Sequence, residues 1–322
     1  MFFKSSDIFQ LPISVYLDIS INRKIIIIII EDRSDAQMQH KRSRRNFLKN
    51  AITTLFSFMG VLLGSGFYVR YIEPFWLSIT NHTITHKLIP PSFDGIKILQ
   101  FSDTHIGFQY QIKDLEKTVQ TINHLQPDIV VFTGDLLDRP DEFYDQNEII
   151  STLSKIMAPL GKYSVYGNHD HGGYGTENYA MMMKESGFEL LRNGNRIINY
   201  RNEQIMIAGI DDPVLGTPKW KQTLFDLTNQ QFCLLLSHAP DLADQAKHYN
   251  VALQLSGHSH GGQVKIPLVG SFMMPIFAKK YYEGMYDLSP LLLYVNRGLG
   301  TTRMPIRLLA RPEISIFTLK TK

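Results

Sequence analysis

The chain has 322 residues, enough for one large domain or two smaller ones with a full hydrophobic core. Hydrophobic residues make up 44% and charged residues 20%, a composition typical of soluble globular proteins. The formal net charge is +3, but residues 40–49 hold five positive charges and no acid, so the rest of the chain sums to about −2; such a body offers no general basic surface, which argues against a nucleic-acid partner.

The N-terminal segment is unusual for its six consecutive isoleucines, Ile25–Ile30, which charged residues flank on both sides. Six residues cannot cross a bilayer, which needs about 20. Met38 stands shortly before a recognisable export signal. We therefore interpret residues 1–37 as a non-native extension upstream of the natural start, or as a disordered tail.

Residues 38–71 are predicted to be a signal or a membrane anchor. The sequence SRRNFLK at 43–49 resembles a twin-arginine export signal, and an uncharged stretch follows it up to Val69. The resemblance implies the twin-arginine translocase as a partner. The positive-inside rule then predicts an extracytoplasmic body that is membrane-anchored or wall-associated. A basic patch before a buried helix is the alternative, and cleavage stays open because no A-x-A site precedes Tyr71.

Residues 72–94 are interpreted as a connector, because prolines at 90 and 91 interrupt regular structure. From residue 95 to 322, short apolar runs alternate with amphipathic patterns, which predicts an α/β domain with a largely parallel core. The predicted strands are 96–102, 128–134, 162–167, 204–210, 232–238, 251–257, 291–297 and 313–319. The predicted helices are 112–125, 146–157, 176–186 and 240–248. Cys233, the single cysteine, lies in one of these apolar runs; it excludes a disulfide framework and is expected to be a buried strand residue.

Polar residues that can bind metals follow the ends of five of the predicted strands. Since ligands bind at the carboxyl ends of strands in open α/β sheets, these residues are expected to meet there. They are Asp103, His105, Asp135, Asn168, His238, His258 and His260. Each alone is compatible with an ordinary turn or a satisfied polar side chain. Their order, Asp-x-His, Gly-Asp-x-x-Asp, Gly-Asn-His-Asp, a distant His and Gly-His-x-His, is poorly explained by chance.

This ordered set resembles the signature of the calcineurin-like metallophosphoesterases over about residues 95–265. The motifs GNHDHGGYG, SGHSHGGQ and YVNRGLG, together with the leader, are most similar to a bacterial, twin-arginine-exported branch of that family. The resemblance implies a four-layer α/β/β/α sandwich with a dinuclear metal site at the carboxyl ends of the strands.

The resemblance also assigns the ligands. Asp103, His105 and His260 are expected to hold a first metal ion, Asp135 to bridge, and Asn168, His238 and His258 to complete a second site. Mixed nitrogen and oxygen ligation without thiolate suits two divalent or trivalent ions such as Mn, Zn, Fe or Co. Such a pair can share a hydroxide that attacks a bound phosphoryl group.

Five further residues are candidates for catalysis or substrate binding. His169 is expected to protonate the leaving oxygen or to stabilise phosphoryl charge, and Asp170 to orient His169 or to pack the turn behind it. Arg297, Arg139 and His171 are candidate substrate contacts, with a salt bridge or a bystander role as the alternative.

The function implied is metal-dependent hydrolysis of a phosphate mono- or diester. The substrate is expected to be a phosphorylated small molecule, lipid or wall polymer of the cell envelope. One alternative is a glycolipid pyrophosphatase of the UDP-2,3-diacylglucosamine type; the Met-, Phe- and Tyr-rich stretch 270–286 then lines an apolar groove, although core packing also explains it. A non-catalytic, metal-containing binding module is the alternative from another class.

Overall fold

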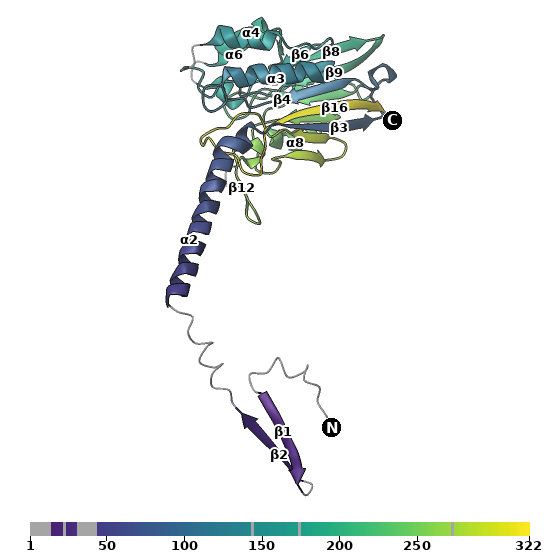
Figure 1. The fold of residues 1–322 in the computed structure, drawn as a ribbon. Helices are drawn as coiled ribbons and strands as arrows, with labels where there is room; N and C mark the ends of the chain where they lie inside the picture. Colours follow the sequence, from purple (N-terminus) through teal and green to yellow (C-terminus); the bar gives the residue numbers. More distant parts are fainter. Residues whose placement is uncertain (1–13, 22–23, 31–43, 143–144, 173–174, 272–273) are drawn as a thin grey trace. The chain divides into compact units, whose positions relative to one another are not determined.

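The computed structural model describes residues 14–21, 24–30, 44–142, 145–172, 175–271 and 274–322 (Figure 1). They fall into two compact units, Met1–Ser65 and Gly66–Lys322. In the first unit, β1 (Ser14–Ile21) pairs antiparallel with β2 (Lys24–Ile30). Both strands lie within residues 1–37, whose interpretation as a non-native extension or a disordered tail stays a prediction. The other residues of 1–37, and Ser43 of the leader motif, lie outside the described residues.

An apolar helix, α2 (Arg44–Phe67), covers most of the predicted signal or anchor. Together with the turns that follow it, this helix gives a candidate membrane span at Asn46–Phe75, with a mean hydropathy of 1.6 over its most apolar window. No part of that window is buried. By length and composition the segment is able to cross a membrane, and a signal sequence has the same properties.

The second unit is built on two mixed sheets, each of six strands in the described part of the chain. The strand order of the first sheet is β3 (Ser78–His86), β16 (Glu313–Thr321), β4 (Lys97–Phe101), β5 (Ile129–Phe132), β6 (Lys162–Ser164) and β7 (Glu189–Leu190). The order of the second is β14 (Gly284–Asp287), β15 (Leu292–Val295), β11 (Leu253–Ser256), β10 (Cys233–Leu236), β9 (Glu203–Gly209) and β8 (Gly194–Tyr200). Neighbours β4, β5 and β6 are parallel, as are β9, β10, β11 and β15, so the parallel core is confirmed.

Strand alternation sorts the apolar side chains into layers. In β5, Ile129 and Val131 enter the core between the two sheets, whereas Val130 and Phe132 face the helices on the outer side. In β10, Leu234 and Leu236 enter the same central core. Because successive strand residues point to opposite faces, a fully apolar strand buries both of its faces. The result is the expected four-layer α/β/β/α sandwich.

Helices cover the outer faces of both sheets. The helices α3 (Ile112–Leu125), α4 (Gln146–Ser154) and α6 (Gly175–Glu185) lie together over the first sheet (Figure 1). The short helix α8 (Ala243–Ala246) packs on the second sheet, and α7 (Trp220–Thr223) contributes Trp220 to the same cluster. Smaller elements are a π-helical turn at Tyr68–Ile72, the helix α5 (Asn168–His171), the two-residue strands β12 (Lys265–Ile266) and β13 (Gly270–Ser271), and 3-10 turns at Glu73–Phe75, Pro91–Phe93, Pro240–Leu242 and His260–Gly262.

Two expectations differ from the structure. The segment 72–94 is more than a connector, because β3 within it pairs in parallel with all nine residues of β16. The strand lies at the edge of the sheet and is only partly covered, so its sequence SITNHTITH can stay polar. The predicted helix 240–248 is a 3-10 turn followed by the four-residue α8, since Pro240 starts it without an amide to donate.

Candidate metal centre and active site

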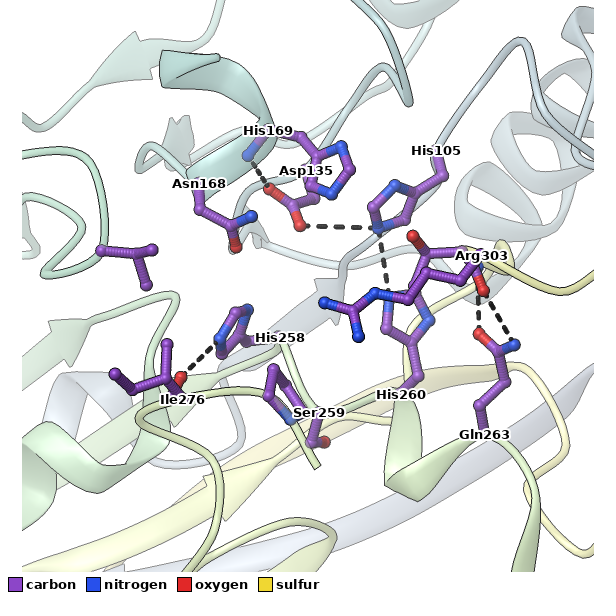
Figure 2. Close-up of a pocket in the computed structure, with 13 residues that line it drawn as sticks. His105, Asp135, Asn168, His169, His258, Ser259, His260, Gln263, Ile276 and Arg303 are labelled. Atoms are coloured by element: carbon purple, nitrogen blue, oxygen red, sulfur yellow. Dashed lines mark hydrogen bonds and ion pairs between the residues drawn. The ribbon is translucent and has the colours of Figure 1, made fainter. Parts of the chain in front are cut away.

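Loops at the carboxyl ends of five strands carry the predicted ligands, five of which line one pocket. Asp103 and His105 follow β4, Asp135 follows β5, and Asn168 follows β6. His238 follows β10, and His258 and His260 follow β11. Asp135, Asn168, His105, His258 and His260 line the pocket shown in Figure 2. Both sheets therefore contribute side chains to the same site.

The first group of donors consists of Asp103, His105 and His260, whose candidate ligand atoms lie within 4.8 Å of one another. The two histidine Nε2 atoms face each other at 3.1 Å, and Asp103 Oδ1 lies 3.5 Å from His260 Nε2. All three side chains are buried. Burial disfavours a charged carboxylate and raises the pKa of Asp103. A cation held by these donors would offset that cost.

The second group consists of Asp135, His238 and His258, again within 4.8 Å. Asp135 Oδ2 lies 3.4 Å from His105 Nε2 and 3.3 Å from His238 Nε2, so this carboxylate stands between the two groups. Burial opposes a charged imidazole, yet the adjacent Asp135 carboxylate raises the pKa of His238 to about 10. This position therefore favours a positive charge, which a metal ion supplies by replacing the proton.

Hydrogen bonds fix which nitrogen of each histidine is free to bind a metal. His238 Nδ1 lies 2.7 Å from the Thr133 carbonyl, and His258 Nε2 lies 2.8 Å from the Ile276 carbonyl (Figure 2). A carbonyl only accepts, so these nitrogens carry the proton and His238 Nε2 and His258 Nδ1 keep a lone pair. The buried Asn168 Oδ1 has no hydrogen-bond partner, and His238 Nε2 has none besides its 3.3 Å ion-pair contact with Asp135 Oδ2. An orphaned buried acceptor is costly, and a bound cation would satisfy it.

The backbone of the ligand loops is also specialised. Left-handed φ values occur at Asp103 (51°), His105 (44°), Asp135 (60°), His258 (72°) and His260 (51°). Such φ values are uncommon outside glycine and persist only where the surroundings impose them, typically at functional sites. The donor types, the lone pairs and the imposed backbone together fit two divalent metal ions.

Glycines allow these loops to approach one another. A Cβ at Gly167 would lie 2.2 Å from Asp135 Oδ1, and one at Gly257 would lie 2.2 Å from Asp103 Oδ2. Neither distance is sterically possible, so the position of each carboxylate depends on a glycine in the neighbouring loop.

His169 lies at the rim of the metal groups. Its backbone N–H donates to Asp135 Oδ1 at 2.9 Å, and its Nδ1 lies 2.7 Å from the Asp138 carbonyl. The carbonyl fixes the proton on Nδ1, so Nε2 is the nitrogen available to a substrate. Burial alone disfavours the imidazolium, but the Asp135 carboxylate and the bond to Asp138 raise the pKa of His169 above its usual value. This arrangement suits a proton donor.

Asp170 supports the site from behind instead of touching the reacting atoms. Its carboxylate accepts backbone N–H bonds from Gly167 and Asp135, both 2.8 Å, and from Leu136 at 3.0 Å. Burial and the nearby Asp135 carboxylate raise the pKa of Asp170 to about 7. Of the two roles expected for Asp170, these bonds match the packing of the turn that joins two ligand loops.

The structure gives other partners to the three expected substrate contacts. Arg139 is exposed and pairs with Glu142 at 3.0 Å. Arg297 faces Glu313, with Nε 3.2 Å from Oε2. His171 Nε2 lies 2.7 Å from Asp211 Oδ1, and its ring stacks on Tyr166. None of the three lines the metal pocket.

Sequence reasoning missed three residues of the site. Asp138 holds His105 Nδ1 at 3.2 Å and is the second acid of the Gly-Asp-x-x-Asp motif, a signal that was visible. Arg303 and Gln263 line the pocket. Gln263 ends the motif SGHSHGGQ, but nothing in the local sequence around Arg303 predicts its place.

Comparisons with known proteins agree with this geometry. A family model described as calcineurin-like phosphoesterase matches residues 96–262. The chain is 47% identical to the metallophosphoesterase YkuE of Bacillus subtilis, over 87% of this chain and 98% of YkuE. It is 28% identical to the phosphodiesterase YaeI of Escherichia coli, over 86% and 99% of the two chains. It is also 30% identical to a Danio rerio protein named transmembrane protein with metallophosphoesterase domain, over 75% of this chain and 57% of that protein. The chain thus belongs to the calcineurin-like phosphoesterase family and is a metal-dependent phosphohydrolase.

Proposed function

We propose that the chain hydrolyses a phosphate mono- or diester of the cell envelope on the outer side of the cytoplasmic membrane. The observation that carries the reaction type is the placement of Asp135 between two groups of buried donors. The first group would bind one metal ion through Asp103, His105 and His260. The second would bind another through Asn168, His238 and His258, with Asp135 shared.

The metal ions supply Lewis acidity and activation of water when they are bound. The protein side chains supply the rest of the chemistry. His169 is proposed to hold a proton on Nε2 and to give it to the leaving oxygen, because Nδ1 is occupied by the Asp138 carbonyl. Asp138 orients His105 through Nδ1, and this leaves the Nε2 lone pair directed at the first metal position.

Two features support a place outside the cytoplasm. The arginine pair Arg44 and Arg45 begins the apolar helix α2, and basic residues at that end favour a translocated body. The Danio rerio relative is named as a transmembrane protein. We propose the twin-arginine translocase as the export route. Replacing both arginines with lysine should retain the protein in the cytoplasm; normal export of that variant would contradict this route.

The side chains that line the pocket support one class of substrate over another. Val214, Pro275 and Ile276 line the pocket beside the metal groups, and Ile276 is 58% exposed. Apolar surface next to a phosphoryl site suits a substrate with a hydrocarbon part. This feature favours a lipid-linked phosphate, including the glycolipid pyrophosphate alternative, over a fully polar wall polymer.

The deciding test is hydrolysis of p-nitrophenyl phosphate and bis(p-nitrophenyl) phosphate by the full chain with Mn, Zn, Fe or Co. We expect activity that requires metal and that Asp135→Asn abolishes, with Asp141→Asn, an exposed acid, as the control. Absence of hydrolysis by the wild-type chain with all four metals would leave the binding-module alternative. An active Asp135→Asn variant would disprove the shared role of that carboxylate.

A further inference from the structure

Arg303 is the arginine that reaches into the metal pocket. Figure 2 shows its guanidinium extending toward the histidine donors, and Arg303 lines the pocket together with His258 and His260. Within the described residues, its side chain takes part in no hydrogen bond or ion pair, whereas Arg139 and Arg297 both face a glutamate. Arg303 is therefore the pocket cation available to a ligand.

A buried glutamine fixes the backbone on both sides of Arg303. Gln263 is 2% exposed, and its Nε2 donates to the Thr302 carbonyl at 3.0 Å and to the Met304 carbonyl at 2.9 Å. Its Oε1 accepts the Thr302 N–H at 2.9 Å. One side chain thus makes three hydrogen bonds to the residues that flank Arg303, which itself has a left-handed φ of 61°.

Gln263 belongs to the loop that carries the metal donors. It follows His260 by three residues, and its own φ is 47°. A second connection runs through the backbone, where the Leu308 N–H donates to the Gln263 carbonyl at 3.0 Å. The loop that places His258 and His260 therefore also places the chain around Arg303.

We propose that Arg303 binds phosphoryl oxygens of the substrate and that Gln263 is its positioning residue. The proposal rests on the proposed function and adds an anion-binding group of the protein to the metal centre. A guanidinium presents two parallel N–H groups that match two oxygens of a phosphate. Because an arginine side chain has many rotamers, a fixed backbone and left-handed φ limit where its fork can lie.

The test uses the full chain loaded with metal and inorganic phosphate as the probe. Calorimetric titration gives the dissociation constant of phosphate, and elemental analysis gives the metal content. We expect Arg303→Gln to weaken phosphate binding on the order of 10–100-fold with the metal content unchanged. Arg303→Lys should recover only part of the loss, because an ammonium lacks the fork. Arg139→Gln, which removes an exposed and ion-paired arginine, is the matched control and should bind as the wild type does.

The positioning role of Gln263 is tested by a double-mutant cycle. Gln263→Glu keeps the acceptor for Thr302 but loses both donated bonds, so it should weaken phosphate binding and raise KM more than it lowers kcat. In an Arg303→Gln background the same change should have almost no further effect, because Gln263 acts through Arg303. Additive losses would refute the positioning role.

Failure of this proposal is distinguishable from failure of the proposed function. Phosphate binding equal to that of the wild type in Arg303→Gln would refute the role of Arg303, whatever the turnover. A wild-type chain that binds phosphate through Arg303 but hydrolyses no ester would leave the anion site standing and overturn the hydrolase. Loss of metal in Arg303→Gln would show that the residue acts on the metal site, and this result also refutes the proposal.

Discussion

Replacing Gly257 with alanine tests how tightly the first metal position depends on loop packing. Gly257 is buried next to β11, and a Cβ there would lie 2.2 Å from both Asp103 Oδ2 and Ser102 Oγ. Real Cβ atoms essentially never approach a neighbour closer than 3.0 Å, so Asp103 Oδ2 must retreat by about 0.8 Å. Metal–ligand distances tolerate only about ±0.2 Å. The φ of Gly257 is not left-handed, so the effect is steric and not one of backbone strain.

Gly257→Ala should therefore lower the metal content from two ions per chain to one and reduce stability by about 1–3 kcal/mol, the usual cost of overpacking. Elemental analysis and thermal unfolding with and without added Mn or Zn measure both effects. Gly194→Ala is the matched control: a Cβ at Gly194, in β8, meets nothing within 4 Å, and the variant should be neutral or slightly more stable. Two tightly bound ions and unchanged stability in Gly257→Ala would refute the packing argument.

Three further predictions concern catalysis, pH and metal. His169→Gln should lower kcat by about 10²–10⁴-fold for alkyl phosphate esters and far less for p-nitrophenyl esters, whose leaving group needs no proton; equal losses would contradict the acid role. Burial raises the pKa of Asp211, but hydrogen bonds from His171 and from the Thr217 N–H outweigh burial, so the net pKa is lowered. The ionised Asp211 therefore stabilises the fold fully above its ordinary pKa of 3.8, and this stabilisation is lost as the pH falls through the lowered value. The difference in urea-unfolding free energy between the wild type and Asp211→Asn should therefore be constant at neutral pH and shrink below pH 3.8; a difference that did not change with pH would rule this out. Chelation should lower the unfolding temperature, since metal binds only the folded site; calorimetry showing an unchanged temperature would exclude a structural contribution from the ions.

The failure of the sequence to predict β3 has a physical cause. The strand β3 is polar and lies at a sheet edge, so its sequence carries no burial signal, and its conformation comes from backbone bonds to β16 more than 230 residues later in the chain. The central strands were predictable because they bury both faces and read as continuous apolar runs. Edge strands and central strands differ in their surroundings, and the local sequence carries a hydrophobic pattern only for the buried central strands.

For the candidate site, too, some features follow from the sequence and others only from the tertiary structure. The sequence by itself predicted the candidate metal donors, because they follow buried strands and the ends of parallel strands meet at one edge. Only the tertiary structure decided which arginine lines the pocket. Arg297 lies beside Glu313 across the fold, whereas the Arg303 side chain has no ion pair with any described residue, and its flanking backbone is held by Gln263, 40 residues earlier in the chain. Ion pairs and side-chain hydrogen bonds to the backbone depend on partners distant in sequence, and a local sequence motif does not show which partners these are.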